Sequence, residues 1–256
     1  MILRRVIAHF RNQEWTAIFI DFVIVVLGVF VGIQVANWNE QRVEDHKAQA
    51  YLARIRGNLD SDLQSIHGRQ VFWARVNDYG KQAIHYAETG ERVEGSAWKT
   101  VLAFYQASQL WQWRTSDSTY QEMRSGGELG LIRDNVLRDA LSQYYLETGS
   151  ASDYLFYLQP EYRKLVRGLT PSVVADYIWA KCWSQPSPLE QHLLDCEAPI
   201  SEEAAQAVLE GYLGDPKLLP ELRFWVANQI VVLNVVKNYT VSLNEMLPRA
   251  TVPTAP

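Results

Sequence analysis

The chain has 256 residues, enough for one large domain or two small ones. Its hydrophobic share of 48% and charged share of 21% are those of a folded protein and exclude a disordered chain. The net charge of −5 and the sequence pI of about 5.6 argue against DNA or RNA binding as a main role, because nucleic-acid-binding surfaces are basic.

Residues 1–14 are predicted to form a basic amphipathic tail. Arg4, Arg5 and Arg11 alternate with apolar residues at helical spacing, which suits the anionic cytoplasmic face of a membrane. Lys and Arg counts alone do not fix the orientation, because further basic residues follow the apolar segment. We expect the N-terminus to be cytoplasmic and the bulk of the chain to lie outside.

The 20 residues from Thr16 to Val35 include only three polar ones. A helix that crosses the hydrocarbon core needs about 20 mostly apolar residues. Trp15 and Trp38 bracket the run ~35 Å apart along a helix, as interfacial aromatic anchors do. The sequence therefore predicts a transmembrane helix over residues 15–38. The alternatives are a buried core helix and a cleaved signal peptide, for which the apolar run is long.

One face of this segment has the features of a helix–helix interface. Gly28 and Gly32 form a GxxxG match, and at ~100° per residue both lie about 20° from Asp21, with Val25 on the same stripe. We expect the stripe to mediate self-association, in which two Asp21 side chains share a proton. Two alternatives stay open. Asp21 faces another membrane protein and carries protons, or its carboxylate extends to the nearby interface.

Two stretches of the chain carry a family resemblance. Met1 to about Leu59 includes MILRRVIAHF, WTAIFIDFVIVVLGVFVGIQVANWNE and YLARIRGNLDSDL, and Thr119 to Tyr145 reads TYQEMRSGGELGLIRDNVLRDALSQYY. They resemble an uncharacterised bacterial family of single-pass membrane proteins whose anchor ends in an Asn-Trp-Asn-Glu-type motif, here Asn37 to Glu40. The resemblance covers roughly half of the chain. It implies a membrane-anchored protein of a Gram-negative bacterium with a helical domain, and it implies no particular activity.

A second, shorter resemblance surrounds Asp21. An Ile-Asp-Phe sequence that precedes an apolar helix is similar to the single-pass subunits of flagellar-stator and biopolymer-transport motors. Those subunits use the aspartate for protons. The rest of the chain does not resemble that family and lacks an evident peptidoglycan-binding domain. This resemblance implies the alternative function, a subunit of a proton-driven membrane motor or channel complex.

The residues beyond the membrane segment are predicted to form an acidic helical bundle over 39–247. Only three basic and two acidic residues precede residue 39, so the remainder carries 21 basic and 27 acidic residues and a net charge of −6. No Gly or Pro lies between Gly32 and Gly57, so we expect the membrane helix to continue into this domain. Gly68 is expected to bend it, and residues 248–256 to form a flexible tail.

Capping signals and 3–4 apolar spacing predict further helices. A helix from Leu222 to Leu247 is apolar but carries too many polar residues for a second crossing. No alternating strand pattern is evident. The other expected helices are Trp98–Trp113, one that starts at Ser118 and ends at Ser125-Gly126-Gly127, Arg133–Leu146, Asp153–Val166, one from Thr170-Pro171 to Trp179, and one from Ser201 to Tyr212.

The two cysteines, Cys182 and Cys196, flank a segment rich in Pro and Ser that is predicted to be a loop. A disulfide across it would stabilise the fold by ~3 kcal/mol and would persist in an oxidising compartment such as a periplasm. Two unpaired thiols are the alternative. A zinc site is disfavoured, because His192 is the nearest extra ligand and no CxxC motif exists.

No motif points to a reaction, a metal or a cofactor. The five histidines lack metal-ligand spacing, and the Arg124–Glu128 segment lacks the Lys-Ser/Thr of a phosphate-binding loop. Some aromatic residues are candidates for a ligand pocket or, more simply, for a helical core: Trp111, Trp113, Tyr120, Tyr144 and Tyr145.

The expectation is therefore a single-pass inner-membrane protein with an all-α periplasmic domain. It acts by binding, as a sensor or scaffold, and its partners are the lipid bilayer and a second copy or another membrane protein. A periplasmic enzyme is disfavoured, because the sequence shows no converging polar groups.

Overall fold

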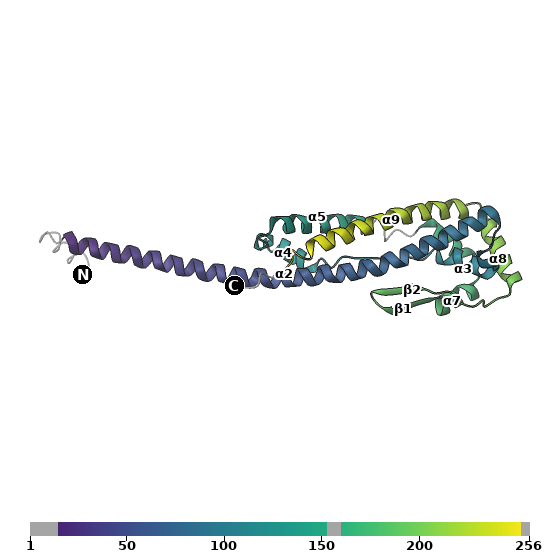
Figure 1. The fold of residues 1–256 in the computed structure, drawn as a ribbon, viewed down its shortest axis with the longest axis horizontal. Coiled ribbons are helices and arrows are strands. Elements are labelled where there is room, and N and C mark those ends of the chain that lie inside the picture. Colours follow the sequence, from purple (N-terminus) through teal and green to yellow (C-terminus); the bar gives the residue numbers. More distant parts are fainter. Residues whose placement is uncertain (1–14, 153–159, 252–256) are drawn as a thin grey trace. The chain divides into compact units, whose positions relative to one another are not determined.

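The structure is a computed structural model that describes residues 15–152 and 160–251. Within these ranges the chain is helical apart from one short hairpin and connecting loops, which confirms the expected all-α class (Figure 1). The chain divides into two compact units, Met1–Tyr51 and Leu52–Pro256. Helix α2, Trp15–Thr89, contributes to both units and runs through 75 residues without a break, so the predicted continuation of the membrane helix is confirmed.

The remaining elements all lie in the second unit. In chain order they are η1 (Val93–Gly95), α3 (Ala97–Gln106), α4 (Ser118–Ser125), η2 (Leu129–Leu131), α5 (Asn135–Ser152), α6 (Glu161–Leu169), α7 (Ser172–Lys181), β1 (Trp183–Ser187), β2 (Glu190–Leu193), α8 (Glu202–Gly214) and α9 (Leu218–Met246).

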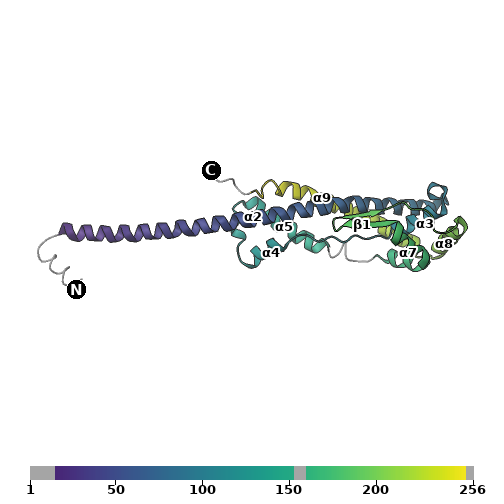
Figure 2. The ribbon, with the colours of Figure 1, turned by 90° about the horizontal axis from the view of Figure 1, so that it is seen from below.

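Within the second unit, α9 packs antiparallel to the C-terminal part of α2 (Figures 1 and 2). The side-chain amide of Asn77 donates to the carbonyl oxygen of Val226 at 3.2 Å, and Arg223 forms an ion pair with Glu88 at 2.6 Å. The indole of Trp225 donates to the carbonyl oxygen of Ala107 at 2.7 Å, which joins α9 to the end of α3. These contacts bury one face of α9 in the core, while its other face, which includes Phe224 and Val231, is exposed.

Two glycines of α2 mark close approaches to other elements. A Cβ at Gly80 would overlap Cγ2 of Val226, and a Cβ at Gly68 would lie 2.6 Å from the carbonyl oxygen of Leu189, in the turn of the hairpin. The sequence predicts a bend in α2 at Gly68, and this prediction is wrong. Gly68 stays helical and admits the backbone of the hairpin instead.

The predicted helix ends are confirmed where a side chain or a glycine caps them. The hydroxyl of Ser201 accepts the N–H of Ala204 at 3.2 Å, so it caps α8. Gly127 has φ of +70°, and the N–H of Glu128 donates to the carbonyl oxygen of Met123 at 2.8 Å. This Schellman arrangement ends α4.

Other predicted ends are shifted. The N-caps of α4 and α7 are Asp117 and Pro171, one residue from the predicted Ser118 and Thr170. Helix α9 begins at Leu218, four residues before the predicted start. The predicted helix over 153–166 lies partly outside the described residues, which place α6 at Glu161–Leu169.

Helix α3 ends seven residues before the predicted Trp113. The chain after it exposes residues 112 and 114 and buries Trp111 and Trp113, the alternation of an extended segment. The guanidinium of Arg69 donates to the carbonyl oxygen of Gln112 at 2.8 Å and thereby holds this segment against α2. Packing of the two indoles thus overrides the helical tendency of the segment.

The ends of the sequence differ in how far they are described. Residues 1–14, the predicted basic tail, lie outside the described residues, as do residues 252–256. In the first part of the predicted C-terminal tail, Ala250 is fully buried and Arg249 forms an ion pair with Asp134 at 3.1 Å. Arg249 and Ala250 therefore contact the rest of the second unit, while Pro248 and Thr251 are exposed.

The glycines of α2 allow a matched test of this packing. Gly80→Ala is expected to lower the free energy of unfolding by about 1–3 kcal/mol, because the added methyl group overlaps Val226. A Cβ at Gly57 has open space around it. Gly57→Ala is therefore expected to raise the free energy of unfolding by up to about 1 kcal/mol, because alanine favours the helix. Urea denaturation of the detergent-solubilised chain, followed by circular dichroism, measures both. Equal stability of the two variants would show that α2 and α9 do not approach as described.

Candidate functional site

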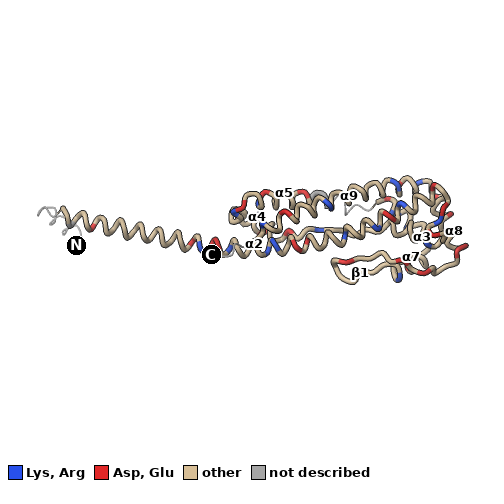
Figure 3. Tube along the Cα trace, viewed as in Figure 1, with Lys and Arg blue, Asp and Glu red and all other residues tan. Residues whose placement is uncertain are grey.

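The N-terminal part of α2 is long and apolar enough to cross a membrane, and it is the only such helix among the described residues. None of its described side chains between Trp15 and Trp38 is buried, and Phe19 is 66% exposed. Figure 3 shows Asp and Glu, Lys and Arg throughout the second unit but almost none in this segment, where Asp21 is the sole charged residue of the sequence from Trp15 to Asn39. A helix that is apolar on all sides matches a lipid environment.

The predicted interface residues lie on this segment. Asp21, Val25, Gly28 and Gly32 are all in α2, and their spacing of three or four residues places them along one side of the helix. Val25 is 64% exposed, and no atom lies within 4 Å of a Cβ built at either glycine. The stripe is therefore uncovered in the single chain, and its pairing stays a prediction.

The two predicted interfacial anchors are exposed at the ends of the segment. Trp15 is 61% exposed and Trp38 is 65% exposed. The guanidinium carbon of Arg42 lies 6.0 Å from the centroid of the Trp38 ring. An aromatic ring with a cation one turn further along suits the region of lipid headgroups.

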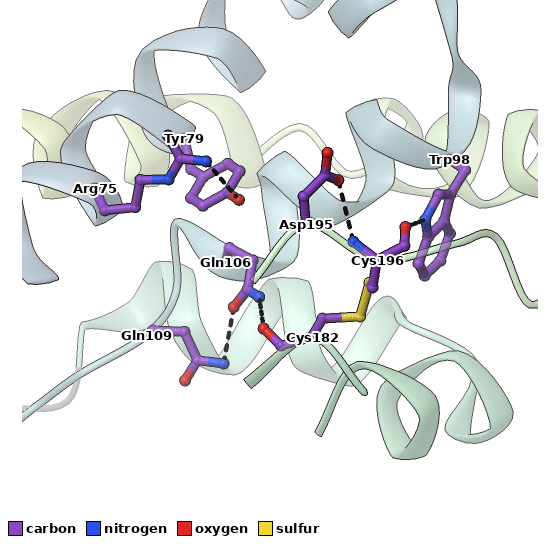
Figure 4. Close-up of a disulfide and its surroundings, with 8 residues drawn as sticks. All are labelled: Arg75, Tyr79, Trp98, Gln106, Gln109, Cys182, Asp195 and Cys196. Carbon is purple, nitrogen blue, oxygen red and sulfur yellow. Dashed lines mark hydrogen bonds between the residues drawn. A yellow bond between two sulfur atoms is a disulfide. The ribbon is translucent and has the colours of Figure 1, made fainter. Parts of the chain in front are cut away.

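Cys182 and Cys196 form the predicted disulfide, with their Cα atoms 5.3 Å apart (Figure 4). The segment between them was expected to be a loop, but it contains the antiparallel pair β1 and β2, with Trp183 opposite Leu193. Strands this short, one of which contains Pro186, leave no clear alternation in the sequence. The disulfide and the neighbouring helices hold the hairpin in place.

Two side chains of α3 hold the backbone of the disulfide (Figure 4). The amide of Gln106 donates to the carbonyl oxygen of Cys182 at 2.8 Å, and the indole of Trp98 donates to the carbonyl oxygen of Cys196 at 3.0 Å. Gln106 is fully buried, so this hydrogen bond satisfies its polar group. The hairpin is thereby fixed to the helical core at both cysteines.

Asp62 of α2 is a carboxylate enclosed in the core, 1% exposed, which the sequence did not single out. It accepts the N–H of Ser116 at 2.8 Å and the hydroxyl of Tyr144 at 2.9 Å. It forms no ion pair with a described residue. Burial raises the pKa of Asp62, although both hydrogen bonds oppose the shift. Burial and the charge of Asp62 likewise raise the pKa of Tyr144.

The five aromatic residues that are candidates for a pocket or a core are all buried, as a core requires. Tyr120 stacks on Tyr145 with their ring centroids 4.7 Å apart, and Trp113 lies 5.7 Å from the ring of Tyr239. Tyr144 also lines a pocket of about 390 Å³ between α5 and α9. The wall of this pocket is formed by Val136, Ala140, Gln143, Tyr144, Glu147, Tyr239, Ser242, Glu245, Met246 and Arg249.

Over the described ranges, 15–152 and 160–251, no group of three or more His, Cys, Asp or Glu side chains converges as metal ligands do. Comparison of the chain with protein-family models, with curated proteins and with solved structures finds no match. The candidate sites are therefore the exposed apolar segment of α2 and the pocket between α5 and α9.

The burial of Asp62 makes stability depend on pH in a defined direction. In the folded chain Asp62 keeps its proton to a higher pH than in the unfolded chain. Its contribution to stability is complete below the ordinary pKa of 3.8 and is lost as the pH rises through the raised folded pKa. Relative to Asp62→Asn, which is always neutral, the natural chain is therefore expected to gain stability as the pH falls from about 7 toward 4.

Urea denaturation at a series of pH values measures this difference. Asp60→Asn is the matched control, because Asp60 is an exposed carboxylate of the same helix. The difference in the free energy of unfolding between the natural chain and Asp60→Asn is expected to vary little over the same pH range. A difference between the natural chain and Asp62→Asn that does not change with pH would contradict the buried state of Asp62.

Proposed function

We propose that the chain is a single-pass membrane protein whose helical unit acts through binding at the membrane surface. The observation that carries the proposal is the 20-residue apolar segment of α2, exposed on all sides and bounded by Trp15 and Trp38. Burying this surface in lipid removes it from water, which is the dominant gain for such a helix. The buried-core alternative requires a protein cover, and none of the described side chains between Trp15 and Trp38 is buried.

The disulfide supports a location for the helical unit. Disulfides persist in oxidising compartments and are rare where thiols are kept reduced. Cys182 and Cys196 both belong to the second unit, so we place this unit in the periplasm and residues 1–14 in the cytoplasm. The family resemblance implies a membrane-anchored protein of a Gram-negative bacterium, which has an oxidising periplasm.

The proposed role is that of a sensor or scaffold that self-associates through the stripe of Asp21, Val25, Gly28 and Gly32. Small residues let two helices approach closely in a membrane, and a shared proton allows two aspartates to face each other. Association in the membrane would bring two helical units together, so that a ligand bound by one is coupled to the other.

A second candidate function rests on Asp21 alone. An acid within a membrane helix is costly, and such residues often mark an ion path. In this alternative Asp21 faces a multi-span partner and carries protons for a motor or channel complex. The two functions differ in what Asp21→Asn does, because proton transfer needs a titrating group and assembly through hydrogen bonds does not.

The orientation is testable with the native cysteines. The chain is expressed in a Gram-negative host, and thiols are labelled with a membrane-impermeant alkylating reagent before and after reduction. The expected result is that the thiols are labelled only after reduction. The chain is also expected to stay in the membrane fraction through alkaline carbonate washing. A chain released by carbonate is not inserted in the bilayer. Thiols that label only after the cells are lysed, without reductant, would place the helical unit in the cytoplasm.

Self-association is testable by crosslinking within the membrane. Gly28→Cys is expected to give a crosslinked dimer under mild oxidation, whereas Val26→Cys, two residues away and on the opposite face, is expected to give little. Asp21→Asn in the Gly28→Cys background is expected to keep the dimer, because an amide still forms a hydrogen bond across the interface. Equal crosslinking at the two positions, or none at Gly28, would exclude this stripe as the interface.

A further inference from the structure

The pocket between α5 and α9 combines a closed aromatic wall with an open charged rim. Its volume of about 390 Å³ lies at the small end of the range for small-molecule sites. Tyr144 and Tyr239 are 3% and 6% exposed, and their rings meet edge to face with centroids 6.1 Å apart. The hydroxyl of Tyr144 donates to Asp62 at 2.9 Å, so this tyrosine offers its ring to the pocket.

Tyr239 has a polar group that the fold leaves unused. Its hydroxyl makes no hydrogen bond with any described residue, although the side chain is more than nine-tenths buried and forms part of the pocket wall. Burial raises the pKa of Tyr239, and the charge of Glu147 adds to the shift. Solvent reaches this hydroxyl, which is not among the fully buried polar atoms, so it is available to form a hydrogen bond with a ligand in the pocket.

The charges around the pocket are unbalanced. Glu147 accepts a hydrogen bond from the amide of Gln143 at 2.8 Å. Among the described residues, Glu147 has no cationic partner, and Glu245 forms neither an ion pair nor a hydrogen bond. Arg249, the one cation among the described wall residues, is compensated by Asp134 at 3.1 Å. Two carboxylates from opposite sides of the pocket therefore face it without compensation, and an anionic ligand is disfavoured.

We propose that this pocket binds a small organic amine, with its ammonium group between Glu147, Glu245 and the hydroxyl of Tyr239 and its apolar part against the ring of Tyr144 and the side chain of Met246. An ammonium group donates hydrogen bonds to both carboxylates and to the phenol oxygen. It is also attracted to the faces of the tyrosine rings. A metal ion is a poorer fit, since it leaves the aromatic part of the wall without contact.

Contacts just after α9 help to hold the pocket together. Arg249 and Ala250 lie three and four residues beyond Met246, and the ion pair of Arg249 with Asp134 and the burial of Ala250 keep the end of α9 beside α5. Both walls of the pocket are thereby fixed before a ligand enters, which reduces the entropy lost on binding.

The experiment uses the full chain in lipid nanodiscs and two matched probes, phenethylamine and 2-phenylethanol, titrated by ligand-observed NMR. The probes have the same aromatic part and differ in the ammonium group. Phenethylamine is expected to bind at least about tenfold more tightly than 2-phenylethanol, the ratio expected from one charge-assisted hydrogen bond. Equal binding of the two probes, or no binding of phenethylamine, would overturn the proposal.

Two conservative variants locate the site. Glu245→Gln removes the charge, and Tyr239→Phe removes only the hydroxyl, so both variants are expected to fold. Phenethylamine binding is expected to weaken at least about tenfold in Glu245→Gln and about threefold in Tyr239→Phe. Glu197→Gln is the control, because Glu197 is an exposed carboxylate outside the pocket, and its binding is expected to stay unchanged. Unchanged binding in Glu245→Gln, or an equal loss in Glu197→Gln, would show that the amine binds elsewhere.

Discussion

The apolar pattern of α2 is the constraint on which the rest of the chain depends. From Thr16 to Val35 nearly every position is apolar, so no face of the helix prefers water. Beyond Leu52 the apolar residues narrow to a stripe, and Ile55, Leu59 and Ile66 are almost fully buried beneath the other helices of the second unit. One continuous helix therefore changes from a surface that is apolar on all sides to a core-forming surface, and this change separates the apolar segment from the helical unit.

Within the second unit, close packing is combined with a small number of buried polar groups. Gly80 lets α9 approach α2, and Asn77 satisfies the carbonyl oxygen of Val226 at the same level. Asp62 ties α2 to α5 through Tyr144 and to the segment after α3 through Ser116. Buried polar groups of this kind are stabilising only when each has a partner, which fixes the register of the helices around them. Tyr239 differs from these groups, because its hydroxyl has no partner among the described residues and is open to solvent.

Several features were predictable because they depend on local chemistry. The helical class follows from the spacing of apolar residues, the ends of α4 and the start of α8 follow from Gly127 and Ser201, and the disulfide follows from the only two cysteines. Other features depend on contacts between distant residues. Residues 110–113 are extended because Trp111 and Trp113 pack on different neighbours, and Gly68 stays helical because the hairpin packs against it. The residues close to Trp111, Trp113 and Gly68 in the sequence do not indicate which distant residues pack against them.

The candidate sites divide in the same way. The sequence alone determined the apolar segment with its tryptophan anchors and the stripe of Asp21, Val25, Gly28 and Gly32, because helical periodicity places residues on a face without any tertiary contact. It also included Tyr144 among the aromatic residues of interest. Only the tertiary structure brought Glu147 and Tyr144 of α5 together with Tyr239 and Glu245 of α9, residues more than 90 positions apart in sequence. A pocket is a property of two packed surfaces, so its charge and its unpaired hydroxyl emerge only when both helices are in place.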